Sequence, residues 1–338
     1  MGEYARSLAI GRAASRRWPG SAIHFVLSKQ APYARGTPFP VTLLDSSPTF
    51  HSGAVIELLT AFKPDVVVFD NAGRTAQLRA ARRLGARVVY ISARARQRRK
   101  AFRWGWSHLI DEHWIAYPEF IAGGLRFLER VKLKLRGRPV VRYLDVVSSG
   151  ADPAEREAAL SRAGCAPESY VLMVPGGGTG HPGVGDAVDA FKGAARALAL
   201  RGVPTVFVAP STADDDARRG EWGPHLHAVG ILPQGQLVEL MRGARLVVAN
   251  GGSTLLQAIA CGRACVAVPI AGDQIERTRR CVAAGVAAAA TPDSDDIRKI
   301  AEHFLQNEPE RAALAGRAAD LRLADGVEVA VRALDGMT

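Results

Sequence analysis

Apolar and polar positions along the chain predict two successive series of strands and helices. Short apolar runs alternate with longer stretches of helical periodicity, a pattern typical of repeated βα units and parallel sheets. The first series predicts strands at residues 23–28, 41–44, 65–70, 87–92 and 113–116, with helices near 52–62 and 73–85. The second predicts strands at residues 170–174, 205–210, 228–232, 246–250 and 265–270, and helices from residue 293 onward. The chain is therefore expected to be an α/β protein.

The two series indicate two Rossmann-like domains. A chain of 338 residues is longer than one hydrophobic core usually accommodates. Polar and small residues gather at 145–153, between the two series, so we place an N-terminal domain at residues 1–148 and a C-terminal domain at residues 149–338. The last helix is expected to pack back on the first domain. Ligands of such sheets bind at the carboxyl ends of the strands, so the loops there should share one edge.

The beginning of the first series is unusual. A doubly wound domain should open with a strand and a glycine-rich turn before its first helix, yet the segment GEYARSLAIGRAASRR begins at the turn itself. Either the first strand of this domain is missing from the chain or translation starts upstream of Met1.

Composition predicts a soluble, globular protein. Hydrophobic residues make up 48% and charged residues 23%, and no segment approaches the roughly 18 uncharged apolar residues of a membrane-spanning helix. The amino terminus lacks the basic and apolar regions of a signal peptide. We therefore expect a cytoplasmic protein.

The four cysteines form no C-x-x-C pair, which favours buried thiols over a metal site or a disulfide; they are Cys165, Cys261, Cys265 and Cys281.

The net charge of +11 is unevenly distributed, with about +15 on residues 1–150 and about −4 on the remainder. This asymmetry indicates an anionic partner for the first half. Much of the charge lies in ARARQRRKAFRWGW, at 93–106, where basic residues adjoin aromatic ones. Such a cluster suits an anionic lipid surface or a nucleic acid, and the alternative is a solvated arginine-rich surface. We expect Arg98, Arg99, Lys100 and Trp104 to contact an acceptor or the inner face of the membrane. We do not expect binding of nucleic acid.

A glycine-rich stretch, PGGGTGHPG, follows a predicted strand and precedes a helix. Gly178, Gly180 and Gly183 match the spacing G-x-G-x-x-G, which lets the backbone approach a phosphate at a helix start. A dinucleotide-binding domain should also place an acidic residue at the end of the next strand, but that strand ends in Pro210 and Ser211. Nicotinamide or flavin binding is therefore not expected, and a plain tight turn stays an alternative.

A second candidate phosphate site is the stretch NGGSTLLQ at 250–257. Gly251 and Gly252 end a predicted strand, while Ser253 and Thr254 stand where N-cap hydroxyls and first-turn amides point out of the sheet. Gln257 lies one turn further on the same side, where it could reach a ribose hydroxyl.

Asp273 and Gln274 follow the next predicted strand and are expected to face the same cleft. A carboxylate beside an amide suits the vicinal hydroxyls of a sugar. The alternative for both segments is a capped helix start and an ordinary turn between helix and strand.

The segment NGGSTLLQAIACGRACVAVPIAGDQ resembles the donor-nucleotide segment of glycosyltransferases with the GT-B fold, in the branch of MurG and the UDP-glycosyltransferases. The nucleotide-sugar hydrolase PseG shares it. The upstream segment GILPQGQLVELM is similar to their W-x-P-Q region, with Pro233 and Gln234 matching and Ile231 in place of tryptophan. The opening GEYARSLAIGRAA resembles their G-H-x-x-R-x-L-x-L-A-x-A, and DGVEVAVRAL the closing helix of the hydrolase.

The resemblance implies two Rossmann-like domains facing across a cleft, with acceptor bound by the first and nucleotide-sugar by the second. Base contact would come from the backbone around Ile231, with uridine favoured over guanosine, adenosine or thymidine. The residues implied to bind the diphosphate are Gly251, Gly252, Ser253 and Thr254, followed by Gln257 for the ribose and by Asp273 and Gln274 for the sugar. The glycine-rich loop would add Gly178, Thr179, Gly180 and His181.

The family pattern is broken at the catalytic position. Many members place a histidine directly after the first-loop glycine, but Glu3 stands there in this chain. A glutamate can act as the base that takes the acceptor's proton, and Asp70 and His181 are further candidates. Alternatively, Glu3 is only a first-turn carboxylate favoured by the helix dipole.

The resemblance thus implies a glycosyltransferase that transfers a sugar from a nucleotide-diphosphate donor, UDP favoured, with inversion and without a metal. No cofactor is expected beyond the nucleotide-sugar substrate, since no D-x-D pair lies near the cleft. The acceptor is expected to be lipid-linked or anionic. A nucleotide-sugar hydrolase or epimerase on the same fold is the main alternative. A noncatalytic sugar-nucleotide or nucleic-acid-binding protein and an unrelated α/β enzyme such as a dehydrogenase are also open.

Overall fold

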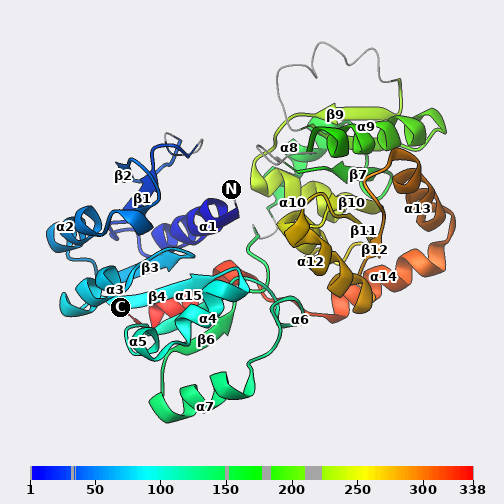
Figure 1. Cartoon of the computed structure of the whole chain (residues 1–338). Coiled ribbons are helices and arrows are strands. Elements are labelled where there is room, and N and C mark those ends of the chain that lie inside the picture. Colours follow the sequence, from blue (N-terminus) through cyan, green and yellow to red (C-terminus); the bar gives the residue numbers. More distant parts are fainter. Residues whose placement is uncertain are drawn as a thin grey trace. The chain divides into compact units, whose positions relative to one another are not determined.

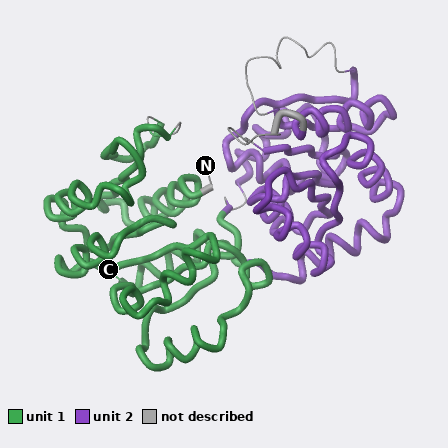
Figure 2. Tube along the Cα trace, viewed as in Figure 1, with its two compact units in different colours: residues 1–147, 324–338 green, residues 148–323 purple. Residues whose placement is uncertain are grey.

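The computed structural model describes residues 2–31, 34, 36–148, 152–176, 184–209 and 223–337. Figure 1 shows helices and parallel sheets throughout, and Figure 2 divides the chain into two compact units. Unit 1 comprises residues 1–147 and 324–338, and unit 2 comprises residues 148–323. The chain therefore leaves unit 1 near the middle of the sequence and returns to it for the last helix.

Unit 1 alternates strands with helices, as the first series predicts. Its elements are α1 (Gly2–Arg17), β1 (Phe25–Ser28), β2 (Val41–Leu44), the short 3-10 helix η1 (Pro48–Phe50), α2 (Ser52–Phe62), β3 (Val66–Asp70), α3 (Thr75–Arg83), β4 (Arg87–Ser92), α4 (Ala95–Ala101), α5 (Trp104–Ser107), β5 (Glu112–Ile115), α6 (Glu119–Ala122), α7 (Phe127–Arg136), β6 (Val140–Tyr143) and α15 (Gly326–Asp335). The predicted first series has no strand at β6, which lies within the predicted N-terminal domain, just before the polar and small residues at 145–153.

Unit 2 repeats the same alternation. Its elements are α8 (Pro153–Ala163), β7 (Val171–Val174), α9 (Val184–Leu200), β8 (Thr205–Val208), β9 (Leu226–Val229), α10 (Gln234–Gly243), β10 (Leu246–Asn250), α11 (Ser253–Ala260), β11 (Cys265–Val268), α12 (Gly272–Ala283), β12 (Ala288–Ala289), α13 (Ser294–Gln306) and α14 (Glu308–Asp320). All five strands of the predicted second series are present, and β12 is an addition of two residues.

The six strands of unit 2 form one parallel sheet in the order β12-β11-β10-β7-β8-β9. The first strand, β7, lies next to β10, so the chain builds outward from β7 in one direction and from β10 in the other. Their junction is a topological switch point, where the loops after the two strands diverge and leave room for a ligand.

The strands of unit 1 form two parallel sheets, β1-β2 and β3-β4-β5-β6. In unit 2 the first strand separates β8-β9 from β10-β11-β12, but unit 1 has no strand before β1 in the described part of the chain. The sheet is thus interrupted where the sequence analysis expects a missing first strand. Val68 in β3 is accordingly 39% exposed.

Strand β4 organises the core of unit 1 on both faces of the larger sheet. Val88 and Tyr90 pack in a cluster with α3 and α5, whereas Val89 and Ile91 pack with α1 and α15. A continuous apolar strand buried on both faces is the pattern that parallel sheets require. The return of the chain to unit 1 therefore supplies one layer of its core.

Helix α15 is fixed where it rejoins unit 1. The side chain of Asp325 caps its first turn by accepting from the amide of Val327, and the Ala324 amide donates to Asp145 Oδ2 at 2.9 Å. A Cβ at Gly326 would collide with the carbonyl group of Leu144, so a glycine is required at this close approach.

The interrupted sheet predicts uneven protection from hydrogen exchange within unit 1. Alternate amides of β3 and of β1 should exchange about tenfold or more faster than those of β4, because β4 has a neighbouring strand on each side. Residue-resolved hydrogen–deuterium exchange measures this directly. Equal protection of β3 and β4 would show that another segment covers the open edge.

Candidate functional site

The carboxyl ends of β7 and β10 meet at the switch point of unit 2 and are joined by one side chain. Asn250, the last residue of β10, is 7% exposed. Its Nδ2 donates to the carbonyl of Pro175 at 2.9 Å, and its Oδ1 accepts from the amide of Gly252 at 2.7 Å. A buried amide with both ends bonded holds its partners rigidly, so the loops after the two strands form one structure.

The glycines around Asn250 are required by this packing. A Cβ at Gly176, whose φ is +91°, would collide with Asn250 Nδ2. A Cβ at Gly252 would lie 2.6 Å from Asn250 Oδ1, and one at Gly251 would lie 2.5 Å from Thr278 Oγ1 on α12. The loop therefore presents bare backbone, which suits the close approach of a phosphate.

Helix α11 begins at this loop without a side-chain cap. Its N-cap is Gly252, and the predicted cap residues Ser253 and Thr254 occupy the first two helical positions instead. Ser253 is exposed and Thr254 is half-buried. Uncapped first-turn amides and the positive end of the helix dipole are a favourable setting for an anion.

A buried arginine adds positive charge to the loop. Arg277 on α12 is 8% exposed, and its Nη1 donates to the carbonyl of Gly251 at 2.7 Å. Its Nη2 lies 3.5 Å from the carboxylate of Asp273, whose side chain is 75% exposed. The sequence analysis missed Arg277, although its position four residues after Asp273 was a usable signal.

Asp273 and Gln274 lie in the first turn of α12, five and six residues beyond the end of β11, rather than at the strand end as the sequence analysis placed them. Gln274 Oε1 accepts from the Ile270 amide at 3.0 Å. Its Nε2 lies 3.8 Å from the position that a Cβ on Gly252 would take. The Gln274 amide is therefore beside the α11 loop, whereas the Asp273 carboxylate points to solvent.

The remaining donor candidates occupy different settings. Gln257 on α11 is 8% exposed, so its amide is largely enclosed by protein. Ile231 is 57% exposed in the loop between β9 and α10. Since β9 is three strands from β10, this loop lies about 14 Å along the same edge. Gly178, Thr179, Gly180 and His181 lie outside the described residues.

Asp70 in unit 1 is occupied by contacts with α1. Arg6 donates to both carboxylate oxygens, at 2.5 and 3.1 Å, and Ser7 Oγ donates at 3.0 Å. Burial raises the pKa of Asp70, and the Arg6 guanidinium and the Ser7 hydroxyl oppose that shift. A carboxylate held in this way anchors α1 to the end of β3, which argues against its predicted use as a base.

Glu3 is exposed at the start of α1 and is oriented by Asn71. Asn71 Nδ2 donates to Glu3 Oε1 at 2.6 Å, and Asn71 Oδ1 accepts from the Ala93 amide at 2.8 Å. Asn71 has a φ of +52°, a conformation that asparagine tolerates better than most residues. Asn71 therefore links the ends of β3 and β4 to Glu3, an arrangement that the sequence analysis did not predict.

The structure corrects the prediction that Arg98 is a surface cation. Arg98 is 8% exposed and donates to Glu129 Oε2 at 2.7 Å and to the carbonyls of residues 122–124. Lys100 Nζ donates to the Gly73 carbonyl at 2.9 Å and lies 3.8 Å from the centre of a Trp106 ring, and burial lowers the pKa of Lys100 to about 8. Two of the three predicted cations thus hold unit 1 together.

Arg99 and Trp104 remain at the surface. Arg99 is exposed, and Trp104 is 53% exposed with the Arg136 guanidinium 4.2 Å from its ring centre. Of the four residues predicted to contact the acceptor or membrane, these two are the accessible ones.

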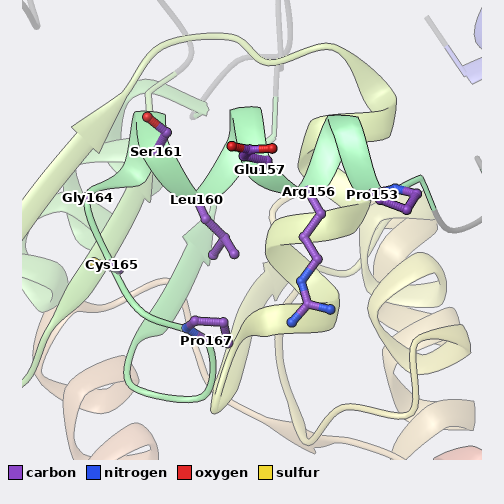
Figure 3. A pocket seen from close by; sticks show the side chains of 8 residues that line it. All are labelled: Pro153, Arg156, Glu157, Leu160, Ser161, Gly164, Cys165 and Pro167. Carbon is purple, nitrogen blue, oxygen red and sulfur yellow. The ribbon is translucent and has the colours of Figure 1, made fainter.

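A separate hollow of about 560 Å³ lies in unit 2 beside α8 (Figure 3). It is lined by Pro153, Arg156, Glu157, Leu160, Ser161, Gly164, Cys165 and Pro167. The lining residues run along α8 from its first residue, Pro153, to the loop that leads into β7, and none of them belongs to the glycine loops after β7 and β10. We therefore do not assign it to the candidate site.

Within the described ranges, no group of three or more histidine, cysteine or acidic side chains is arranged to hold a metal ion. The four cysteines are free thiols. In the same ranges no helix has both the length and the apolar character needed to cross a membrane.

Solved structures with a similar fold include three proteins that match nearly the whole chain. MurG of Acinetobacter baumannii is 15% identical, with a TM-score of 0.64 and coverage of 99% of this chain and 96% of that one. UGT2 of Phytolacca americana, solved with UDP-2-fluoro-glucose and pterostilbene, is 10% identical, with a TM-score of 0.68 and coverage of 100% and 97%. A putative UDP-N-acetylglucosamine 2-epimerase of Listeria monocytogenes is 16% identical, with a TM-score of 0.60 and coverage of 97% and 92%.

The chain has the GT-B fold. This confirms the fold that the resemblance implied. No protein-family model and no curated protein sequence matches the chain.

The burial of Arg98 generates a stability prediction with a neighbouring control. Arg98→Glu should lower the free energy of unfolding of unit 1 by about 3–5 kcal/mol or prevent its folding, because Glu129 and three carbonyls lose their partner. Arg99→Glu, at an exposed position, should stay within about 0.5 kcal/mol of the parent. Urea unfolding followed by tryptophan fluorescence reports on unit 1, which holds four of the five tryptophans. Equal effects of the two substitutions would contradict the buried role of Arg98.

Proposed function

We propose that this protein is a glycosyltransferase that takes a sugar from a nucleotide-diphosphate donor, with UDP favoured as the nucleotide. The observation that carries the proposal is the bare-backbone loop at the switch point of unit 2, with the uncapped start of α11 and the buried Arg277 beside it. These groups converge on one place and suit a diphosphate. The GT-B neighbour solved with a UDP-sugar analogue supports this reading.

We assign the donor's parts along the carboxyl edge of the unit 2 sheet. The diphosphate binds the backbone at Gly251–Thr254, and Gly178, Thr179, Gly180 and His181, which follow β7 in the sequence, are proposed to contribute. The base binds near Ile231, about 14 Å away along the edge. The sugar meets the exposed carboxylate of Asp273 and the amide of Gln274. Gln257 is the residue that we propose for the ribose, although only a small part of its side chain is accessible.

The proposed transfer inverts the anomeric centre and needs no metal. An acceptor hydroxyl oxygen attacks the anomeric carbon, its proton passes to a base, and the bond from that carbon to the diphosphate oxygen breaks. Glu3 is the base that we favour, since it is exposed and is oriented by Asn71, whereas Asp70 is occupied by Arg6 and Ser7. The amides of α11 and the charge of Arg277 would stabilise the negative charge that develops on the leaving diphosphate.

Unit 1 would bind the acceptor. The excess of about +15 on residues 1–150 favours an anionic or lipid-linked acceptor and a place at the inner face of the membrane, in cell-envelope synthesis.

A nucleotide-sugar hydrolase or epimerase is the second candidate, because a putative UDP-N-acetylglucosamine 2-epimerase shares the fold. The two functions differ in their need for an acceptor. A transferase should release UDP from UDP-sugars only when an acceptor source, such as a chloroform–methanol lipid extract, is added. A hydrolase should release UDP without it, and an epimerase should convert the sugar without releasing UDP.

Arg277→Ala should weaken UDP binding about 10- to 100-fold, because it removes a buried positive charge and the bond that fixes the Gly251 carbonyl. Thermal-shift titration with UDP, compared with GDP, ADP and dTDP, measures both the affinity and the preferred base. Arg279→Ala is the matched control, since Arg279 is exposed on the same helix and pairs with Glu276. Unchanged UDP stabilisation in the Arg277 variant would place the diphosphate elsewhere. A Gly252→Val substitution would not test phosphate binding, because its Cβ would collide with Asn250 whether or not a phosphate binds.

Glu3→Gln should reduce sugar transfer about 10²- to 10⁴-fold while UDP stabilises the variant as it does the parent, because the substitution removes a base and leaves the donor loop intact. Glu57→Gln, an exposed carboxylate on α2, is the control. Parental activity in Glu3→Gln would show that another group takes the proton of the acceptor hydroxyl. Glu3 would then be only a first-turn carboxylate of α1.

A further inference from the structure

Helix α7 is oriented with three of its five apolar side chains in solvent. Phe127, Leu128 and Leu135 are 71%, 68% and 69% exposed, whereas Glu129 is buried. A surface helix of a globular protein normally does the reverse and directs its apolar stripe to the core. Figure 1 shows α7 at the margin of unit 1, away from the sheets.

Polar contacts on the opposite side hold this orientation. Glu129 accepts from Arg98 at 2.7 Å and from the Arg126 amide at 2.9 Å, which fixes the first turn. Lys132 Nζ donates to the Phe102 carbonyl at 3.1 Å, and Arg136 Nη1 donates to the Trp104 carbonyl at 3.1 Å. The helix is thus attached along its whole length, and exposure of its apolar side chains does not result from a detached segment.

The exposed side chains form one stripe. At about 100° per residue, Phe127, Leu128 and Leu135 fall within roughly a third of the helix circumference. Arg130 and Lys134 are exposed along one margin of that stripe. Glu129, the only acidic residue of the helix, is buried and paired with Arg98. The free surface of α7 therefore carries apolar and positive groups.

A tryptophan continues this surface beyond the helix. Trp104 on α5 is 53% exposed, and Arg136 of α7 lies against its ring at 4.2 Å. Tryptophan is favoured at the boundary between lipid headgroups and hydrocarbon.

We infer that α7 docks unit 1 on an anionic lipid surface, with Phe127, Leu128 and Leu135 entering the interface and Arg130 and Lys134 facing the headgroups. The apolar stripe is complementary to the hydrocarbon of the lipid, and the basic residues beside it are complementary to the anionic headgroups. A second copy of the chain is a poorer occupant, because apposed α7 helices would bring Arg130 and Lys134 near their counterparts. The inference rests on the membrane part of the proposed function, and it moves the contact from the 94–106 cluster to α7 and Trp104.

Sedimentation with vesicles tests the inference. The full chain should bind vesicles of phosphatidylcholine mixed with phosphatidylglycerol more tightly than vesicles of phosphatidylcholine alone, and added salt should weaken the difference. Combining Phe127→Ser, Leu128→Ser and Leu135→Ser should lower the partition into mixed vesicles about tenfold or more, and Arg130→Glu with Lys134→Glu should abolish the preference for the anionic lipid. Both variants should fold, since all five side chains are exposed.

The matched control combines Phe50→Ser, 69% exposed in unit 1, with Leu200→Ser, 87% exposed in unit 2, and should bind vesicles like the parent. Failure of the parent to bind mixed vesicles, or equal binding by the triple serine variant, overturns the inference. A parental dimer that the triple variant loses would assign the stripe to a second copy instead. UDP stabilisation is measured on the same proteins: its absence in a parent that binds vesicles refutes the proposed donor and leaves the docking surface standing.

Discussion

The candidate donor site depends on one buried amide. Asn250 ends β10 and reaches the carbonyl that follows β7, so it spans the two strands at which the order of the sheet reverses. Asn250 leaves no space for a side chain on Gly176 or Gly252, and Thr278 leaves none on Gly251, so the loop must expose its backbone. Arg277 then approaches the Gly251 carbonyl directly. The exposed backbone and the packing of the loop have the same origin.

Unit 1 uses an asparagine at the corresponding edge for a related purpose. Asn71 follows β3, accepts from the backbone after β4 and donates to Glu3. In both units an asparagine side chain ties together the carboxyl ends of two adjacent strands. A side-chain amide suits this position because it both donates and accepts, whereas a carboxylate only accepts when ionised. In unit 1 Asn71 orients the exposed carboxylate of Glu3, whereas the nearby carboxylate of Asp70 is bonded to Arg6.

The alternation of apolar runs and helical stretches predicted the α/β class, the division into two series and ten strands, because parallel strands are apolar enough to be recognised singly. It missed β12, which is two residues long, and β6, which lies near the end of the predicted N-terminal domain. Spacing also located the glycine loop. The contribution of Arg277 depends on how α12 packs beside that loop. The burial of Arg98 depends on its bonds to carbonyls more than twenty residues away. Neither is a local property. The sequence analysis also has no helix at α7, and periodicity alone does not show whether an apolar face is turned inward.

The return of the chain to unit 1 has a consequence for its synthesis. Ala330, Ala333 and Leu334 of α15 complete the cluster under one face of the β3–β6 sheet, and they lie 183 or more residues after Val147, the end of the unit's first segment. During translation unit 2 is therefore finished before unit 1 can close its core, the reverse of the usual order in which the amino-terminal domain folds first. Until the last helix leaves the ribosome, the nascent chain exposes Val89, Ile91 and the inner face of α1, which are the surfaces that a chaperone would bind.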